Sequence, residues 1–291
     1  MIPRFSLDRP GTLEEAFDAF ATAGGDAAYI AGGTELLQVM KMGFAQFDTL
    51  IDLKRIADLQ GVSIADDGSL WIGAATTHRE IEQSQVVRTA LPALSGLERE
   101  VANVRVRNTG TLGGNLAFAE PHSDPATLLV ACGATIRLAG RGGSRTLPMD
   151  EFVVGPLVTA REDDEILVGV SVPARGSGEG RGYAKLAFFE RPAASVGVRL
   201  TVEGGAISSA TVAVGSIGEV PEVVERAGSG LVGVAARPDA LAARVSELSD
   251  AFAAVDAVQD LNGSPDYKRH LAAVLTRQAA QAAVEEAARG V

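Results

Sequence analysis

Hydrophobic residues recur at helical spacing near both ends of the chain. Near the N-terminus, Leu13, Ala16 and Phe20 follow a Thr-x-x-Glu capping box that starts at Thr12. Near the C-terminus, an alanine-rich segment favours a helix from about residue 267 to residue 288. These patterns predict a short N-terminal helix and a longer C-terminal one.

Between these helices, short apolar runs bounded by turn residues predict β-strands. The Asp-Asp-Gly-Ser sequence at residues 66–69 predicts a hairpin turn, and a second capping box, from Thr77 to Glu80, opens another helix. Residues 123–125 (Ser-Asp-Pro) form a further helix start. The expected strands are residues 27–30, 49–53, 70–74, 134–138, 166–172, 196–202 and 210–214. This mixture of elements predicts an α+β chain.

Two glycine-rich segments separate some of these elements. The first, Ala31-Gly32-Gly33-Thr34, connects an expected strand to an apolar helix that begins at Leu36. The second runs from Thr109 to Leu116 and contains few helix formers, so we expect loop and strand edge there. Neither segment matches Gly-x-Gly-x-x-Gly or a Gly-Lys-Ser/Thr loop, which disfavours a Rossmann or P-loop nucleotide site.

The strongest compositional break is Ala-Arg-Gly-Ser-Gly-Glu-Gly-Arg-Gly at residues 174–182. Such glycine-rich runs are typical of linkers. We therefore place the domain boundary here, and we expect one domain over residues 1–175 and a smaller α+β domain over residues 181–289.

Composition narrows the classes of partner. The chain has 291 residues with 26 Lys and Arg against 37 Asp and Glu, and its formal charge of −11 disfavours a nucleic-acid surface. We find no apolar stretch near the ~20 residues that span a bilayer and no secretion signal, so we expect a cytoplasmic location. Cys132 is the only cysteine, so this chain alone cannot ligate an iron–sulfur cluster.

Both glycine segments have the chemistry that a polyphosphate needs. Glycine has no side chain and tolerates positive φ, so backbone N–H groups can approach the phosphates closely. Thr34 and Thr111 add hydroxyl donors, Asn115 adds an amide, and Asp124 is a candidate acceptor for ribose hydroxyls. Taken singly, each glycine pair is more often a turn and Asp124 more often a helix cap.

Taken together, Ala31-Gly32-Gly33-Thr34-Glu35-Leu36-Leu37 and Thr111-Leu112-Gly113-Gly114-Asn115-Leu116-Ala117 resemble the paired FAD motifs of the molybdenum hydroxylase flavoprotein family. That family includes carbon monoxide dehydrogenase medium subunits and the FAD domain of xanthine dehydrogenase. Further similarity lies at residues 76–78, 105–108 and 267–271. The resemblance implies a two-subdomain FAD-binding fold of the vanillyl alcohol oxidase (PCMH) type, followed by the smaller C-terminal domain.

The resemblance also implies which residues bind FAD. The two motifs would enclose the diphosphate, and Asp124 would hold the ribose. Val101 and Ala102 match an apolar stretch near the flavin or adenine, while Leu167 and Lys185 match positions at the edge of the cofactor. The full set is Ile30, Ala31, Gly32, Gly33, Thr34, Glu35, Leu36, Val101, Ala102, Thr111, Gly113, Gly114, Asn115, Asp124, Leu167 and Lys185.

In function, the resemblance implies an FAD-dependent oxidoreductase subunit. A large molybdenum-cofactor subunit and a small subunit with 2Fe-2S clusters would be its partners, in a dimer of heterotrimers. Electrons would pass from the partner clusters through FAD to an external acceptor, so we assign no catalytic residue. Two alternatives remain open, a stand-alone FAD-dependent oxidase and a non-catalytic, flavin-free scaffold.

Other features are interpreted as structural. His78, His122 and His270 lack metal-ligand spacing, so surface or capping roles are expected and no metal site is predicted. The acidic run at residues 162–165 is expected to be a solvated turn. Many relatives have a basic pair and an acidic residue where this chain has Phe188-Phe189-Glu190-Arg191-Pro192, so the region near the exposed flavin edge is expected to differ.

Overall fold

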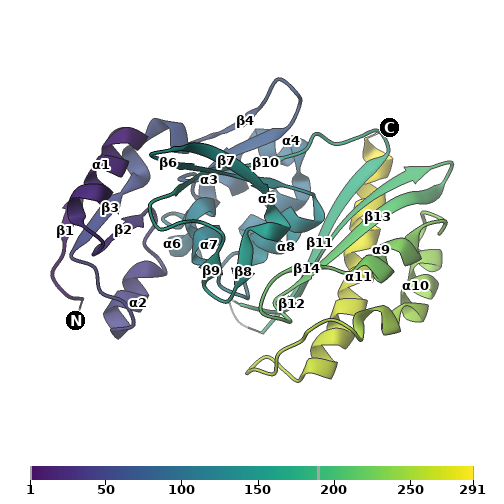
Figure 1. Ribbon diagram of the computed structural model, residues 1–291. Helices are drawn as coiled ribbons and strands as arrows, with labels where there is room; N and C mark the ends of the chain where they lie inside the picture. The colour runs from purple at the N-terminus through teal and green to yellow at the C-terminus, as the bar shows by residue number, and fades with distance from the viewer. Residues whose placement is uncertain (1, 189–190, 291) are drawn as a thin grey trace.

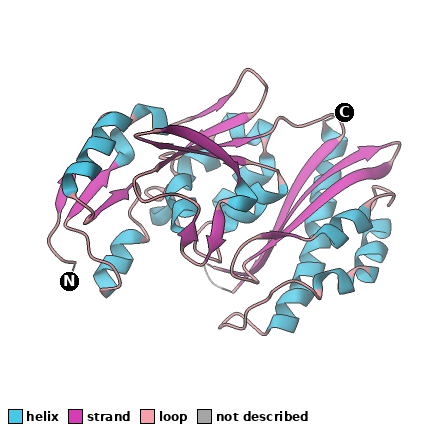
Figure 2. Cartoon of the chain, viewed as in Figure 1, coloured by secondary structure: helices cyan, strands magenta, loops and turns pink. Residues whose placement is uncertain are grey.

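The computed structural model describes residues 2–188 and 191–290 and shows helices and sheets arranged in three consecutive parts (Figure 1). The first two parts contain separate sheets, and the third is a sheet covered by helices (Figure 2). Phe189 and Glu190, in the segment that departs from the family pattern, lie outside the described residues.

The first part is a small parallel sheet with two helices. Its strands pair in the order β1-β3-β2, and Ile51 of β3 packs with Ala16 of α1 in a core in which both are 0% exposed. The Thr12 hydroxyl caps α1 by accepting from Glu15 N, whereas the Glu15 carboxylate accepts from Gly11 N. The elements are β1 (Ser6–Asp8), α1 (Leu13–Ala23), β2 (Ala27–Ile30), α2 (Leu36–Met42) and β3 (Thr49–Asp52).

The second part is a five-stranded antiparallel sheet in the order β4-β5-β10-β6-β7, with six helices along the chain between β5 and β6. Its strands are β4 (Val62–Ile64), β5 (Leu70–Gly73), β6 (Thr135–Gly140), β7 (Gly143–Pro148) and β10 (Ile166–Val172), and a small hairpin joins β8 (Val153–Gly155) to β9 (Val158–Thr159). Its helices are α3 (His78–Gln83), α4 (Gln85–Ala90), α5 (Pro92–Arg99), α6 (Val104–Arg107), α7 (Leu112–Phe118) and α8 (Asp124–Ala131).

Helix α7 corrects the prediction of loop and strand edge for the second glycine segment. The low helix propensity of glycine is outweighed by a cap and by tertiary contacts. Thr111 Oγ1 accepts from Gly114 N at 3.0 Å, and Gly113 N donates to Ala74 O at 2.9 Å. A Cβ on Gly113 would lie 2.7 Å from Ala74 O, so only glycine lets this helix start so close to the end of β5.

The third part is an antiparallel sheet in the order β11-β12-β13-β14. Its elements are β11 (Glu179–Ala187), β12 (Pro192–Glu203), β13 (Ala206–Gly215), β14 (Glu222–Val223), α9 (Glu225–Leu231), α10 (Pro238–Glu247) and α11 (Pro265–Arg289). Helices α9 to α11 pack on one face, where a Cβ on Gly180 or Gly182 of β11 would collide with the α11 backbone. Residues 179–182, expected to be linker, are therefore strand, and their glycines admit the helix.

Helix α8 covers the other face of this sheet. A Cβ on Gly197 of β12 would lie 2.9 Å from Ala131 Cβ, and Thr127 Oγ1 lies 3.0 Å from Ser195 Oγ. Because α8 also belongs to the core of the second part, it joins the two parts. The prediction of a two-subdomain α+β fold followed by a smaller α+β domain is confirmed.

Candidate functional site

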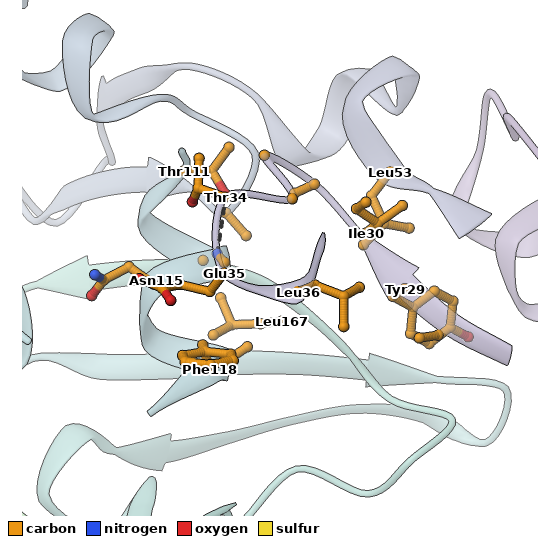
Figure 3. Close-up of a pocket in the computed structure, with 18 of the residues that line it drawn as sticks. Tyr29, Ile30, Thr34, Glu35, Leu36, Leu53, Thr111, Asn115, Phe118 and Leu167 are labelled. Carbon is orange, nitrogen blue, oxygen red and sulfur yellow. Dashed lines mark hydrogen bonds between the residues drawn. The ribbon is translucent and has the colours of Figure 1, made fainter. Parts of the chain in front are cut away.

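A cavity of about 760 Å³ lies where the two glycine segments meet, within the ~300–1,000 Å³ range typical of small-molecule sites. Figure 3 shows Thr34 and Glu35 of the first segment near Thr111 and Asn115 of the second. Tyr29, Ile30 and Leu53 lie at the other end of this view, and Phe118 and Leu167 add apolar surface. The cavity therefore combines polar loops with apolar walls.

The two glycine segments touch through their backbones. A Cβ on Gly32 would lie 2.6 Å from Gly110 Cα, so a side chain at position 32 would push the segments apart. An isolated bridge pairs Thr77 with Thr111, and His78 N donates to Gly110 O at 3.0 Å. The start of α3 thereby fixes the position of the second segment.

Backbone donors in the first segment are unpaired beside the cavity in the described part of the chain. Gly33 adopts φ +69°, which turns the chain between β2 and α2. Within the described part of the chain, the N–H groups of Gly33, Thr34 and Glu35 have no acceptor, and all three residues line the cavity. Such a row of free N–H groups fits a polyphosphate.

Asp124 is a buried carboxylate in the cavity wall, held by the C-terminal domain. Its Oδ1 accepts from Tyr183 Oη at 2.6 Å and its Oδ2 accepts from Lys185 Nζ at 3.0 Å. Burial raises the pKa of Asp124, and the charge of Lys185 together with both hydrogen bonds acts against this. Burial also raises the pKa of Tyr183 well above its usual value, so its hydroxyl remains a donor.

The structure brings together nearly all of the residues that the sequence assigns to FAD. Residues 30–36, Val101, Ala102, Thr111, Gly113, Gly114, Asn115, Asp124 and Leu167 all line the cavity. Lys185 is the exception, since it lines a separate hollow between α5, β11 and α11 and reaches the site only through Asp124. Their individual roles stay predictions.

The loop at Val101 and Ala102 is fixed by an arginine that sequence reasoning did not single out as a site residue. Arg107 Nη1 donates to both carbonyl oxygens, at 3.0 Å and 3.2 Å. Ala102 adopts φ +41°, which is unfavourable for a residue with a side chain. The two contacts from Arg107 therefore stabilise a strained stretch of the cavity wall.

A charged cluster joins the two domains beside the cavity. His122 Nδ1 lies 3.0 Å from Glu120 Oε1, and His122 Nε2 lies 2.9 Å from Asp260 Oδ2. Lys268, 1% exposed, donates to the same Asp260 oxygen at 2.7 Å. The hydrogen bond to Glu120 raises the pKa of His122 despite its burial, and the contact with Asp260 adds to this. Partial burial acts to raise the pKa of Asp260, but hydrogen bonds from Lys268 and His122 outweigh this and lower that pKa to about 2.

Several residues that sequence reasoning did not assign to FAD also line the cavity, among them His78, Glu120 and Arg191. His78 was expected at the surface or at a cap, but it is 2% exposed, although it does begin α3. The capping box gave its place on the helix, whereas nothing in the sequence indicated that its ring is buried. Arg191 contacts Glu120 at 3.2 Å across the domain boundary, which spacing along the chain could not indicate.

The acidic run at residues 162–165 forms a turn. The Glu165 carboxylate accepts from Arg145 Nε and Nη2, each at 2.7 Å, and Glu162 N donates to Glu165 Oε2. Over residues 2–188 and 191–290, no group of three or more His, Cys, Asp or Glu side chains is arranged to hold a metal. In the same residues, no helix is both long and apolar enough to cross a membrane.

Residues 3–175 match the model of the FAD binding domain in molybdopterin dehydrogenase, and residues 190–283 match that of the CO dehydrogenase flavoprotein C-terminal domain. The chain belongs to this family of FAD-binding medium subunits. It is 35% identical to the carbon monoxide dehydrogenase medium chain of Hydrogenophaga pseudoflava, with 97% of each chain covered. The resemblance in the two glycine motifs is thus confirmed, and with it an FAD-binding oxidoreductase subunit of the molybdenum hydroxylases.

Other family members have different names but the same fold. A chain of quinoline 2-oxidoreductase from Pseudomonas putida 86 superposes with a TM-score of 0.91 at 28% identity, covering 99% of each chain. The nicotine 6-hydroxylase medium subunit of Paenarthrobacter nicotinovorans is 31% identical, over 95% of this chain and 96% of the relative. The family therefore keeps one architecture in enzymes whose names give different substrates.

Proposed function

We propose that this chain is the electron-relay subunit of a larger hydroxylase or dehydrogenase, with FAD held in the cavity between the glycine segments. The observation that carries the proposal is the meeting of these segments at one cavity, with free N–H groups at Gly33, Thr34 and Glu35. When bound, FAD supplies the redox chemistry, taking electrons that reach it through partner iron–sulfur clusters and passing them to an external acceptor.

The residues of this chain bind, orient and shield the cofactor. Residues 31–35, with Thr111, Gly113, Gly114 and Asn115, enclose the diphosphate, and Asp124 accepts from the ribose hydroxyls. Val101 and Ala102 lie near the flavin or adenine, and Leu167 lies at the edge of the cofactor. Lys185 acts through its ion pair with Asp124. None of these roles requires a proton to be moved by this chain, so no catalytic acid or base is assigned.

The proposed partners are a large subunit with the molybdenum cofactor and a small subunit with 2Fe-2S clusters, assembled as a dimer of heterotrimers. The names of the relatives support a substrate site on another subunit, because chains named for carbon monoxide, nicotine and quinoline enzymes match this chain over nearly its whole length. The burial of Cys132 supports the proposal that the iron–sulfur clusters lie on another subunit. Burial raises the pKa of this thiol to about 12, which disfavours the thiolate form that would ligate iron.

The division into residues 1–175 and 181–289 is also a proposal, supported by the separate sheets on either side of the boundary. Strand β11 begins at Glu179, so this division places its first two residues outside the second domain. The cytoplasmic location expected from the sequence stays a prediction.

A visible absorption spectrum of the purified full chain, before and after denaturation, tests the proposal. We expect released FAD, together with molybdenum- and iron-containing proteins that copurify from the native source. FAD bound with substrate turnover by the isolated chain would instead indicate a stand-alone oxidase. Failure to bind FAD after reconstitution would indicate a scaffold.

A further inference from the structure

A buried imidazole lies behind the junction of the two glycine segments. His78 Nδ1 is 2.6 Å from Glu98 Oε2, and the two residues are 2% and 0% exposed. The other carboxylate oxygen, Glu98 Oε1, is buried with no hydrogen-bond partner in the described part of the chain. Glu98 therefore depends on this one contact, which fixes the orientation of the ring.

The other edge of the ring faces the glycine segments. A Cβ on Gly110 would lie 3.3 Å from His78 Cδ2, the carbon bonded to Nε2, and 3.4 Å from Thr34 Oγ1. His78 also lines the cavity, and no residue in the described part of the chain hydrogen-bonds its Nε2. This nitrogen remains available to a ligand beside Thr34 and Gly110.

The charges around the cavity leave few cationic side chains for an anionic ligand. The described lining contains two arginines and five acidic residues, which are Glu35, Glu120, Asp124, Asp163 and Glu165. Arg191 is already paired with Glu35 and Glu120, and Arg161 Nη1 donates to three backbone carbonyls. Both ring nitrogens of His122 contact carboxylates. Beside these paired groups, His78 keeps an unpaired Nε2 next to the glycine segments in the described part of the chain.

We propose that His78 binds the diphosphate of FAD through Nε2, with Glu98 as the positioning residue that orients the ring. This inference rests on the proposed role of the glycine segments. It adds a charged side chain to a site otherwise formed by backbone N–H groups, hydroxyls and an amide.

Protonation of the ring gives the contact its pH dependence. Burial acts to lower the pKa of His78, but the charge and hydrogen bond of Glu98 on α5 outweigh it, so the pKa is raised. Asp124 on α8 also raises the pKa, and Arg107 on α6 lowers it. FAD affinity should therefore be highest below the His78 pKa and should fall as pH rises through it.

Four variants of the full chain, freed of flavin and titrated with FAD between pH 6 and pH 9, test this inference. In H78N, the Asn amide keeps a donor near Glu98 but removes Nε2, and we expect FAD to bind about tenfold to a hundredfold more weakly. In H78Q, the longer side chain reaches toward the Nε2 position, which should restore part of the affinity without the pH dependence. In E98Q, the fall in affinity should move to lower pH. H270N, on the exposed side of α11, serves as the control and should bind like the wild type.

Binding of ADP and of adenosine, which both lack the flavin, distinguishes a contact with the diphosphate from a contact with the flavin. If His78 acts on the diphosphate, H78N should weaken ADP about as much as FAD and leave adenosine unchanged. Equal FAD affinity and an equal pH profile in wild type and H78N, with the thermal midpoint confirming a folded variant, would overturn the inference. So would weakened FAD with unchanged ADP. If the wild type itself binds no FAD, the proposed function fails instead.

Discussion

Tyr183 Oη donates a 2.6 Å hydrogen bond to Asp124 Oδ1, so a residue of the C-terminal sheet directly supports the wall of the FAD cavity. Asp124 begins α8, and Tyr183 lies on the β11 face turned away from the glycines that pack against α11. The second domain therefore contributes to the site through Asp124, in addition to covering it.

Replacing Tyr183 with Phe removes one of the two side-chain donors to this carboxylate. Because Asp124 is 5% exposed, we expect the free energy of unfolding to fall by about 1.5–3 kcal/mol, with weaker FAD binding. Urea denaturation and FAD titration of Y183F measure both. Y267F, at an exposed tyrosine on α11, is the control. Equal FAD affinity in Y183F and wild type would show that the hydrogen bond is structural only.

Replacing Gly114 with Leu tests the position of the diphosphate. Gly114 is exposed to the cavity, and a Cβ there would meet only Thr111 Oγ1, at 2.9 Å. We therefore expect G114L to fold but to retain no FAD, as read from the absorption spectrum of the purified variant. In contrast, G96A on the exposed face of α5 has open space around its Cβ and should raise stability by about 0.5–1 kcal/mol without affecting FAD. Normal FAD content in G114L would contradict the site.

The His122 cluster predicts a pH-dependent contribution to stability. The folded-state pKa of His122 lies above its ordinary value of 6.5, so its contribution is fully present below about pH 6.5 and is lost as pH rises through the folded pKa. In H122N, the loss of unfolding free energy relative to wild type should be largest near pH 6 and should shrink toward pH 9.

Chemical denaturation at several pH values measures this difference. D260N and the double variant H122N/D260N complete a cycle that isolates the part that depends on Asp260, because residues in contact give non-additive effects. A wild-type-to-H122N difference that stays constant from pH 6 to pH 9 would argue against a protonated His122 in the cluster.

The sequence predicted those features that depend on residues close together along the chain. The cap at Thr77 and the strand–turn–helix through Gly33 follow from local rules, and both are present. Helix α7 was not predictable in this way, because it depends on Ala74, which approaches Gly113 only in the folded chain. Glycine was interpreted as a break in structure, whereas here it permits close packing.

The candidate site likewise contains residues that the local sequence indicates and residues that only the folded chain brings together. The two glycine motifs identified the polar segments that meet at the cavity, since their spacing and composition are specific. The ring of His78 was missed because its partner, Glu98, lies on another helix. Lys185 was assigned to the cofactor edge, and the structure places it behind Asp124 instead. Such contacts are set by tertiary packing and leave no pattern along the chain.

Helix α8 lies in the core of one domain and against the sheet of the next, with Gly197 permitting the close approach. Separating the domains would expose both the apolar face of α8 and the sheet surface that it covers. The two domains are therefore expected to depend on each other for stability, although a boundary separates them along the chain. The two halves should melt in a single cooperative transition, and a fragment that ends in the glycine-rich segment should lack the support that keeps α8 folded.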